Sequence, residues 1–398
     1  MRPIPYARQS VSQADIDAVA EVLRSDWLTQ GPCIGRFEQE VATYCGAQYA
    51  AAVSNGTAAL HIACLALDLG PGDLVWTSAN TFVASANCAR YCGADVDFVD
   101  IDPRTYNMST TALEEKLAAA LRVARLPKIV IAVHFGGQSC DMRTIARLGD
   151  RYGFHVIEDA SHAIGADYLS QKVGSCRYSD ITVFSFHPVK LMTTGEGGML
   201  LTNDKELAQR LRLLRTHGIT RDQEQMVGVS EGPWYYEQVC LGYNYRMTDM
   251  QAALGSSQLK RLDEFLARRR KLVRRYDGAL KGLPLALPFE ENAGRSAWHL
   301  YVIQLDLEAV GTTRSTLFER MRVAGVLVNV HYIPVYRQPY FRNFGFNPSH
   351  FPGCERYYER AISLPLYFDL TDAEQDRVCA VLRESLQTGA LPRGTGTR

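Results

Sequence analysis

Short continuous runs of apolar and β-branched residues recur through the first half of the chain, and helical patterns separate several of them. One run ends at Val53, and the others are DLVWTS, ADVDFVD, KIVIAVHF, FHVIEDA and DITVFSF. A helical pattern, DMRTIARLGDRYG, leads into FHVIEDA. Strands of this kind separated by helices are typical of a mostly parallel sheet covered on both faces. The pattern therefore predicts an α/β fold.

Three helical patterns have distinct characters. Ser12 opens an S-x-x-D capping box before an amphipathic pattern, which ends at Gly31-Pro32. The segment AALHIACLAL is apolar on nearly every side, so we expect a buried helix there. A second capping box, formed by Thr248 and Gln251, precedes a long helical pattern that runs through LKRLDEFLARRRKLVRRY. That pattern predicts a long helix between two domains.

The domain organisation follows from these patterns and from the length. A chain of 398 residues is too long for one core of ordinary size. After Pro284 the strands and helices become shorter, which indicates a separate α+β unit. We predict an N-terminal arm at 1–35, a large α/β domain at 36–250, a linking helix at 251–283 and a smaller C-terminal α+β domain at 284–398.

Composition narrows the classes of function. Lys plus Arg total 43 and Asp plus Glu total 43, so no net charge recruits nucleic acid or an anionic membrane. No apolar stretch approaches the roughly 18 residues of a membrane span, and the first residues contain no signal-peptide run. We therefore expect a cytoplasmic protein. The 10 Cys form no C-x-x-C pair, and we expect neither a metal site nor disulfides.

Residues that can carry chemistry follow three of the predicted strands. In VSNGT, small residues and a hydroxyl stand where a strand gives way to a helix, and free amides there can hold a phosphate; an ordinary tight turn is the alternative. Asp159 comes at the end of a buried strand, where a carboxylate is costly unless a cationic or hydrogen-bonding group pairs with it. Lys190 follows another strand, where a lysine is usually a surface residue. The carboxyl ends of parallel strands form the usual ligand site of such sheets.

These three features together suit pyridoxal phosphate. A carboxylate stabilises the protonated pyridine nitrogen of this cofactor, which makes the ring an electron sink. A lysine holds the cofactor as an imine and then moves protons. A phosphate cradle retains it when the imine is broken.

Five motifs carry a resemblance to a known family. SNGTAAL, EDASHAIGA, FSFHPVK, TTGEGGML and NYRMTDMQAALG closely resemble the DegT/DnrJ/EryC1/StrS family of sugar aminotransferases, which are pyridoxal phosphate enzymes of fold type I. The resemblance covers about residues 5 to 385. It implies that the 36–250 domain binds the cofactor and that the protein is a homodimer with shared active sites.

The resemblance also implies a role for particular residues. Lys190 would be the catalytic lysine that holds the cofactor as a Schiff base, and Asp159 would face the pyridine nitrogen. The other expected cofactor contacts are Gly56, Thr57 and Ser185 at the phosphate, Phe82 stacked on the ring, His162 near the ring hydroxyl, and Asn244 at the phosphate of the other subunit's cofactor.

Further segments resemble the branch of the family that aminates a 4-keto sugar in pseudaminic acid synthesis. They are IPYARQSV, DWLTQGP, FHPVK, GPWYYEQ, VHYIPVYRQPYF and AISLPLY. The implied substrates are a UDP-linked 4-keto-6-deoxy sugar and L-glutamate as amino donor. For the diphosphate we expect His331 and Arg337, and a loop-stabilising role is the alternative for the histidine.

Two other readings compete. One is an aminotransferase for a different keto sugar linked to UDP, GDP or dTDP, which spacing alone does not exclude. The other is a regulatory protein that binds pyridoxal phosphate without catalysis, and the presence of both Lys190 and Asp159 argues against it. A dehydratase of the same fold would carry His in place of the imine lysine.

Overall fold

The chain is described from a computed structural model, in which residues 2–387 are placed. Its centre is a seven-stranded sheet in the order β2-β10-β9-β6-β5-β3-β4. The pairs β9–β6, β6–β5, β5–β3 and β3–β4 are parallel, and β10 is antiparallel to both of its neighbours. The strands are β2 (Tyr49–Val53), β3 (Leu74–Ser78), β4 (Asp95–Val99), β5 (Ile129–Val133), β6 (His155–Asp159), β9 (Ile181–Ser185) and β10 (Gly198–Thr202).

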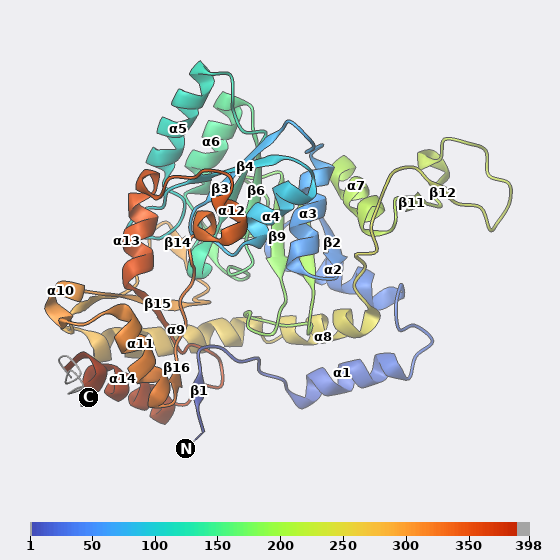
Figure 1. Ribbon diagram of the computed structural model, residues 1–398. Helices are drawn as coiled ribbons and strands as arrows, with labels where there is room; N and C mark the ends of the chain where they lie inside the picture. The colour runs from blue at the N-terminus through green and yellow to red at the C-terminus, as the bar shows by residue number, and fades with distance from the viewer. Residues whose placement is uncertain (1, 388–398) are drawn as a thin grey trace, which may run out of the picture.

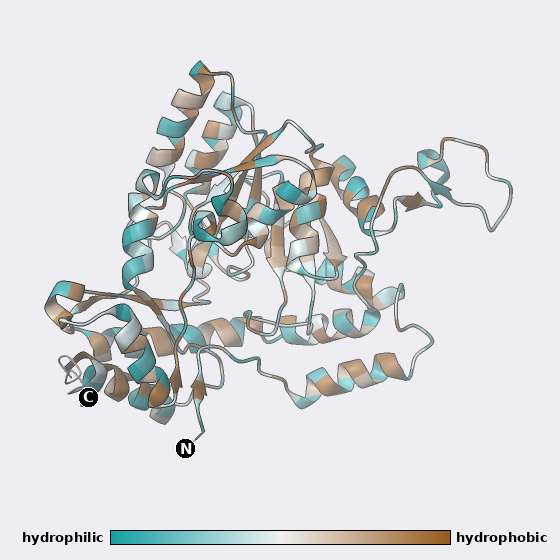
Figure 2. Cartoon of the chain, in the orientation of Figure 1, coloured by the Kyte–Doolittle hydropathy of each residue, from teal (hydrophilic) through white to brown (hydrophobic). Residues whose placement is uncertain are grey.

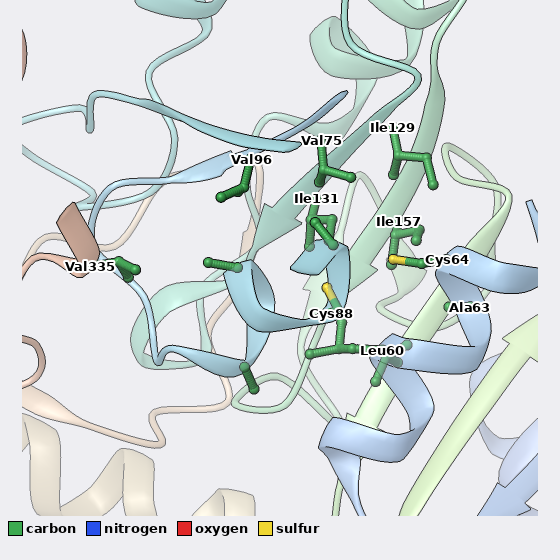
Figure 3. Packing of buried hydrophobic residues seen from close by; sticks show 14 of the residues in the cluster. Leu60, Ala63, Cys64, Val75, Cys88, Val96, Ile129, Ile131, Ile157 and Val335 are labelled. Atoms are coloured by element: carbon green, nitrogen blue, oxygen red, sulfur yellow. The ribbon is translucent and has the colours of Figure 1, made fainter. Parts of the chain in front are cut away.

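Helices cover both faces of this sheet because alternate strand residues point to opposite sides. Val75 and Ile131 belong to the core under α3, α4 and α7, whereas Trp76 and Val130 pack under α5 and α6. Figure 3 shows the first of these cores. At the β2 end of the sheet, α2 and α8 cover the second face. The helices are α2 (Pro32–Cys45), α3 (Gly56–Ala66), α4 (Ala84–Tyr91), α5 (Thr110–Arg122), α6 (Met142–Tyr152), α7 (Lys205–Arg215) and α8 (Asp249–Leu259).

A second core lies in the C-terminal part of the chain. A three-stranded sheet, ordered β13-β15-β17, packs there with α9, α11 and α14 (Figure 1). The elements of this part are α9 (Leu262–Leu280), β13 (Leu285–Ala286), β14 (Gly294–Arg295), β15 (Tyr301–Leu305), α10 (Leu307–Val310), α11 (Arg314–Val323), β16 (Val326–Leu327), α12 (Pro339–Arg342), α13 (Pro352–Arg360), β17 (Ala361–Leu364) and α14 (Asp372–Gln387). Strand β14 joins β7 (Asp167–Tyr168) and β8 (Gln171–Lys172) in another small sheet.

The N-terminal segment connects the two cores. Strand β1 (Ile4–Pro5) pairs in parallel with β16, and helix α1 (Gln13–Leu23) packs along α8. Both predicted capping boxes are confirmed, at Ser12 with Asp15 and at Thr248 with Gln251. The Gln258 amide of α8 also donates to the buried Asp15 carboxylate at 2.7 Å. The cap of α1 is therefore tied directly to α8.

Two features differ from a simple reading of the sequence. The range in which one linking helix is expected holds two helices, α8 and α9, and Arg261 between them lies 3.5 Å from the Asp15 carboxylate of α1. Beyond α7, the segment that carries β11 (Ile219–Thr220) and β12 (Glu237–Gln238) projects from the body (Figure 1). Its Val227, Val229 and Trp234 side chains are largely exposed.

The expected α/β fold with a mostly parallel central sheet is confirmed. Figure 2 shows apolar residues concentrated along the strands of the central sheet, whereas apolar and polar residues alternate along α5 and α6. Across residues 2–387, no helix is long and apolar enough to cross a membrane. The same residues contain no cluster of His, Cys, Asp and Glu that could hold a metal ion, and the cysteines are free thiols.

Candidate functional site

A cavity of about 790 Å³ opens at the carboxyl ends of the central strands. This volume lies within the range of small-molecule sites, roughly 300–1,000 Å³. Its wall includes most of the residues expected at a cofactor site: Gly56, Thr57, Phe82, Asp159, His162, Ser185 and Lys190. Tyr6 of the N-terminal segment and His331 of the C-terminal part also line it. The site thus draws on three parts of the chain.

The turn between β2 and α3 forms one end of the cavity. Asn55 caps α3 by accepting from the Ala58 amide at 2.8 Å, which leaves the first-turn amides of Gly56 and Thr57 without intrahelical partners. A Cβ atom on Gly56 would lie 2.8 Å from the Ser185 Cβ. Glycine therefore lets the helix start and the end of β9 approach each other, and the Ser185 hydroxyl reaches this end of the cavity.

Asp159 ends β6 and is 6% exposed. Both of its carboxylate oxygens accept a hydrogen bond: Oδ2 from the Ser85 hydroxyl at 2.6 Å and Oδ1 from the Ser161 amide at 3.2 Å. The Asp159 carboxylate thus has two hydrogen-bond donors on the protein side and the cavity on its other side. This arrangement suits a carboxylate that pairs with a cationic group in the cavity.

Lys190 follows β9 in a turn stabilised by its amide, which donates to the His187 carbonyl at 2.8 Å. Burial lowers the pKa of the Lys190 ammonium group from 10.5 to about 8, and the Asp159 carboxylate partly opposes this shift. An amine with a pKa near 8 is about half uncharged at pH 8 and about one tenth uncharged at pH 7, far more than an ordinary lysine, so its nitrogen is available as a nucleophile and a base.

His162 and Tyr332 form a hydrogen-bonded pair in the cavity wall. The Tyr332 hydroxyl lies 3.1 Å from His162 Nε2, and the Gly136 amide donates to His162 Nδ1 at 3.3 Å. Burial, with smaller contributions from Lys190 and His331, lowers the pKa of His162 well below its ordinary value. Because Nδ1 accepts a hydrogen bond, neutral His162 carries its proton on Nε2. His299 packs against it, with ring centroids 4.3 Å apart.

The two residues expected at the diphosphate lie apart. His331 lines the cavity, and its Nδ1 lies 2.8 Å from the Ser363 hydroxyl. Burial lowers its pKa to about 3, so it is neutral. Arg337 does not line the cavity within the described residues, because its guanidinium pairs with the Glu355 carboxylate. The expectation that Arg337 reaches a substrate here therefore finds no support in this arrangement.

Phe82 and Asn244 are the most exposed of the expected cofactor contacts. The Phe82 ring is 57% exposed, and its centroid lies 6.1 Å from that of Tyr332. Asn244 forms a backbone bridge with Thr216 and is absent from the cavity wall of its own chain. Both side chains are free to meet groups from outside the chain.

These residues fit pyridoxal phosphate. The Gly56 cradle leaves room for a phosphate beside Ser185, a doubly anchored carboxylate stands at Asp159, and Lys190 supplies an amine of lowered pKa. The cavity thus has a partner for each polar part of the cofactor.

Several residues in or behind this wall carry no signal in the sequence patterns. They are Tyr6, His61, Ser85, Ser161, His299 and Tyr332. Hydroxyl and imidazole groups like these are common in any chain, and tertiary contacts alone bring them to the site. Ser85 lies three residues after Phe82, in the segment SANTFVAS, and Tyr332 directly follows His331. Closeness in sequence to these expected site residues is the only signal that the sequence offers for the two.

Comparison with known families gives one family model that matches residues 9–383, described as the DegT/DnrJ/EryC1/StrS aminotransferase family. The chain is 42% identical over 384 residues to the spore coat polysaccharide biosynthesis protein SpsC of Bacillus subtilis (strain 168), covering 96% of each chain.

Solved structures agree with this match. The chain resembles Helicobacter pylori PseC, described as an aminotransferase involved in the biosynthesis of pseudaminic acid, with a TM-score of 0.87, 27% identity, and 97% and 99% of the two chains covered. It also resembles the pyridoxal phosphate form of the putative sugar aminotransferase Spr1654 from Streptococcus pneumoniae, with a TM-score of 0.86, 28% identity, and 96% and 98% covered.

Proposed function

The chain belongs to the DegT/DnrJ/EryC1/StrS aminotransferase family and is a pyridoxal phosphate-dependent sugar aminotransferase, and from this premise we propose its substrate and the roles of its residues. The proposed acceptor is UDP-2-acetamido-2,6-dideoxy-β-L-arabino-hex-4-ulose, and the proposed amino donor is L-glutamate. The activity would be that of the UDP-4-amino-4,6-dideoxy-N-acetyl-β-L-altrosamine transaminase of pseudaminic acid biosynthesis.

One observation carries the assignment of the reacting group: Lys190, with its lowered pKa, lies in the same cavity wall as Asp159 and the Gly56 cradle. When bound, pyridoxal phosphate supplies an aldehyde that takes up the amino group and a ring that accepts electrons. The Lys190 nitrogen would take the proton from the substrate carbon that bears the amino group and deliver it to the cofactor carbon that carries the aldehyde. Asp159 stabilises positive charge at the ring nitrogen.

Other residues bind and orient. Amides of Gly56 and Thr57, with the Ser185 hydroxyl, would hold the phosphate. Phe82 would cover one face of the ring. The pair of His162 and Tyr332 would meet its hydroxyl edge. Amination of the ketone and deamination of glutamate pass through one site, so the kinetics should be ping-pong.

The substrate proposal is supported by the branch motifs in the sequence and by the likeness to a structure described as a pseudaminic acid pathway aminotransferase. His331, which lines the cavity beside Tyr6, is the proposed sugar-side contact. Its neutral imidazole suits hydrogen bonding to hydroxyl or amide groups of a sugar rather than charge pairing.

We also propose a homodimer in which Asn244 of each subunit reaches the other subunit's cofactor phosphate. Asn244 is exposed and next to Tyr245, which lines the cavity, and the projecting 219–238 segment exposes apolar side chains that a second copy would cover. The cytoplasmic location expected from the sequence stays a prediction.

Product analysis tests the substrate. Purified protein and L-glutamate are incubated separately with 4-keto-6-deoxy sugars linked to UDP, GDP and dTDP, and amination is followed by mass spectrometry. The proposal predicts amination of the UDP-linked 4-ulose and formation of 2-oxoglutarate. Preferential amination of a GDP- or dTDP-linked sugar would instead identify an aminotransferase for a different keto sugar.

A further inference from the structure

Two buried hydroxyl groups stand in line behind the Asp159 carboxylate. The Ser85 hydroxyl lies 2.6 Å from Asp159 Oδ2, and the Thr81 hydroxyl lies 2.9 Å from the Ser85 hydroxyl. Ser85 is 0% exposed and Thr81 is 1% exposed. Solvent therefore does not reach the Ser85 hydroxyl.

The direction of each hydrogen bond follows from the acceptor at the end of the line. An ionised carboxylate only accepts, so the Ser85 hydroxyl donates its single proton to Asp159. The Ser85 oxygen is then free to accept, and the Thr81 hydroxyl donates to it. Each bond polarises the next, which strengthens the final donor to the charged oxygen. The distance of 2.6 Å is typical of a hydrogen bond to a charged oxygen.

The position of Ser85 indicates that it acts through Asp159. Thr81, Phe82 and Asp159 line the cavity, whereas Ser85 is not part of the cavity wall in the described part of the chain. Ser85 lies in the first turn of α4, and its amide donates to the Phe82 carbonyl at 3.3 Å. One short segment thus presents the Phe82 ring to the cavity and the hydroxyl to the back of the carboxylate.

The contacts on the carboxylate restrict its rotation. Ser85 holds Oδ2 from α4, and the Ser161 amide holds Oδ1 from the turn after β6. Rotation about the side chain would break both hydrogen bonds in a buried setting, which is unfavourable. Each oxygen keeps a second lone pair for a group in the cavity.

We propose that Thr81 and Ser85 form a hydroxyl relay that holds the Asp159 carboxylate in place and aims it at the ring nitrogen of the cofactor. Ser85 is a positioning residue for transamination, and no contact between Ser85 and the cofactor is required. This inference rests on the proposed contact between Asp159 and the ring nitrogen. It adds an account of how the Asp159 carboxylate is held in position for that contact.

The experiment measures cofactor affinity of the full-length protein after the cofactor has been removed. Each variant is titrated with pyridoxal phosphate and with an analogue in which carbon replaces the ring nitrogen, and binding is followed by absorbance. The variants are Ser85→Ala, Ser85→Thr, Thr81→Val and Asp159→Ala. Thr77→Val is the matched control, because Thr77 in β3 also carries a fully buried hydroxyl, which donates to the Ile131 carbonyl at 3.1 Å.

The proposed relay predicts a loss of cofactor affinity that depends on the presence of the ring nitrogen. Ser85→Ala should weaken binding of pyridoxal phosphate by about 10-fold to 100-fold, the range expected for a hydrogen bond to a charged group. Binding of the carbon analogue should change much less. Ser85→Thr should restore affinity, and Thr81→Val, which removes only the outer donor, should cause a smaller loss. Thr77→Val should bind both compounds as the parent protein does.

Two results separate failure of the relay from failure of the proposed site. If Asp159→Ala weakens binding of pyridoxal phosphate but Ser85→Ala and Thr81→Val do not, the relay is overturned and the role of Asp159 stands. If Asp159→Ala binds both compounds like the parent, the assignment of Asp159 itself is wrong. An equal loss for both compounds in Ser85→Ala would indicate general damage to the site and would also overturn the relay.

Discussion

The Asp159 carboxylate raises the pKa of Lys190, but burial of the lysine outweighs it and leaves the pKa at about 8. Asp159 ends β6 and Lys190 lies in the turn after the neighbouring parallel strand β9, so both stand at the same edge of the sheet. Burial makes the Lys190 ammonium group easier to deprotonate. The Asp159 carboxylate raises the pKa in the opposite direction, so the amine stays more basic than burial alone would leave it.

The first prediction concerns pH. Only the uncharged amine attacks an aldehyde, so capture of pyridoxal phosphate by the cofactor-free protein should accelerate as the pH rises and reach half of its maximum near pH 8. Asp159→Asn should move this midpoint to lower pH, because the carboxylate raises the pKa. Stopped-flow absorbance measures the rate. A midpoint near the ordinary lysine value of about 10.4 would contradict the burial of this group.

Replacement of Lys190 would remove both the proposed anchor of the cofactor and the proposed proton carrier. Lys190→Ala should lower turnover by about 100-fold to 10,000-fold, the contribution typical of a general base, and should end covalent attachment. Borohydride reduction followed by peptide mass spectrometry checks the attachment, with Lys172, which pairs with Asp167, as the internal control. A reduced adduct that persists in the variant would show that another lysine binds the cofactor.

Gly56→Ala should damage the phosphate cradle. The added Cβ would lie 2.8 Å from the Ser185 Cβ, so the helix start must move away from β9. We expect about 10-fold weaker binding of pyridoxal phosphate, as for other overpacked sites, and a smaller change for pyridoxal, which lacks the phosphate. Gly278→Ala is the control, since a Cβ there has open space. Equal losses for both compounds would place the phosphate elsewhere.

Much of this arrangement could be predicted from sequence, and the reasons are local. The parallel strands are recognisable in the sequence because buried strands are largely apolar, as in β5, and Asp159 and Lys190 stand out because they come at or after strand ends. Strand β10 was missed because its short apolar run follows a glycine-rich segment. The partner of Arg337 has no signal in the sequence, because Glu355 lies on another helix and only the fold brings the two together. The hydroxyls of Ser85 and Tyr332 have no pattern that distinguishes them from other side chains.

A buried carboxylate beside the site offers a test of stability. Glu158 accepts hydrogen bonds from His134 at 2.7 Å, Ser179 at 2.5 Å and Thr182 at 3.1 Å. Burial would raise its pKa, but these contacts leave the pKa lowered. Glu158→Gln should cost about 3 kcal/mol or more in unfolding free energy, measured by urea denaturation. Glu114→Gln, which loses a pair with Arg151 at the surface, should cost less than about 1 kcal/mol.

The shared active site can be tested by subunit mixing. Lys190→Ala and Asn244→Asp should each be weakly active alone, the second because a carboxylate repels the cofactor phosphate. Mixed dimers contain one site with Lys190 from one subunit and Asn244 from the other. We expect activity to reappear after the two variants are denatured and refolded together. Activity no greater than the sum of the separate variants would indicate that each site is built from one chain.

Strand β10 has a geometric consequence for the cofactor. Gly198 stands opposite Val53 on one side and Ser185 on the other, so it joins the strand before the phosphate cradle to the strand before Lys190. A Cβ at Gly198 would lie 2.5 Å from the Asn55 carbonyl oxygen. The missing side chain at Gly198 thus lets the turn at Asn55 and Gly56 lie directly against β10. A side chain at position 198 would therefore displace the proposed phosphate cradle, although Gly198 is not part of the cavity wall in the described residues.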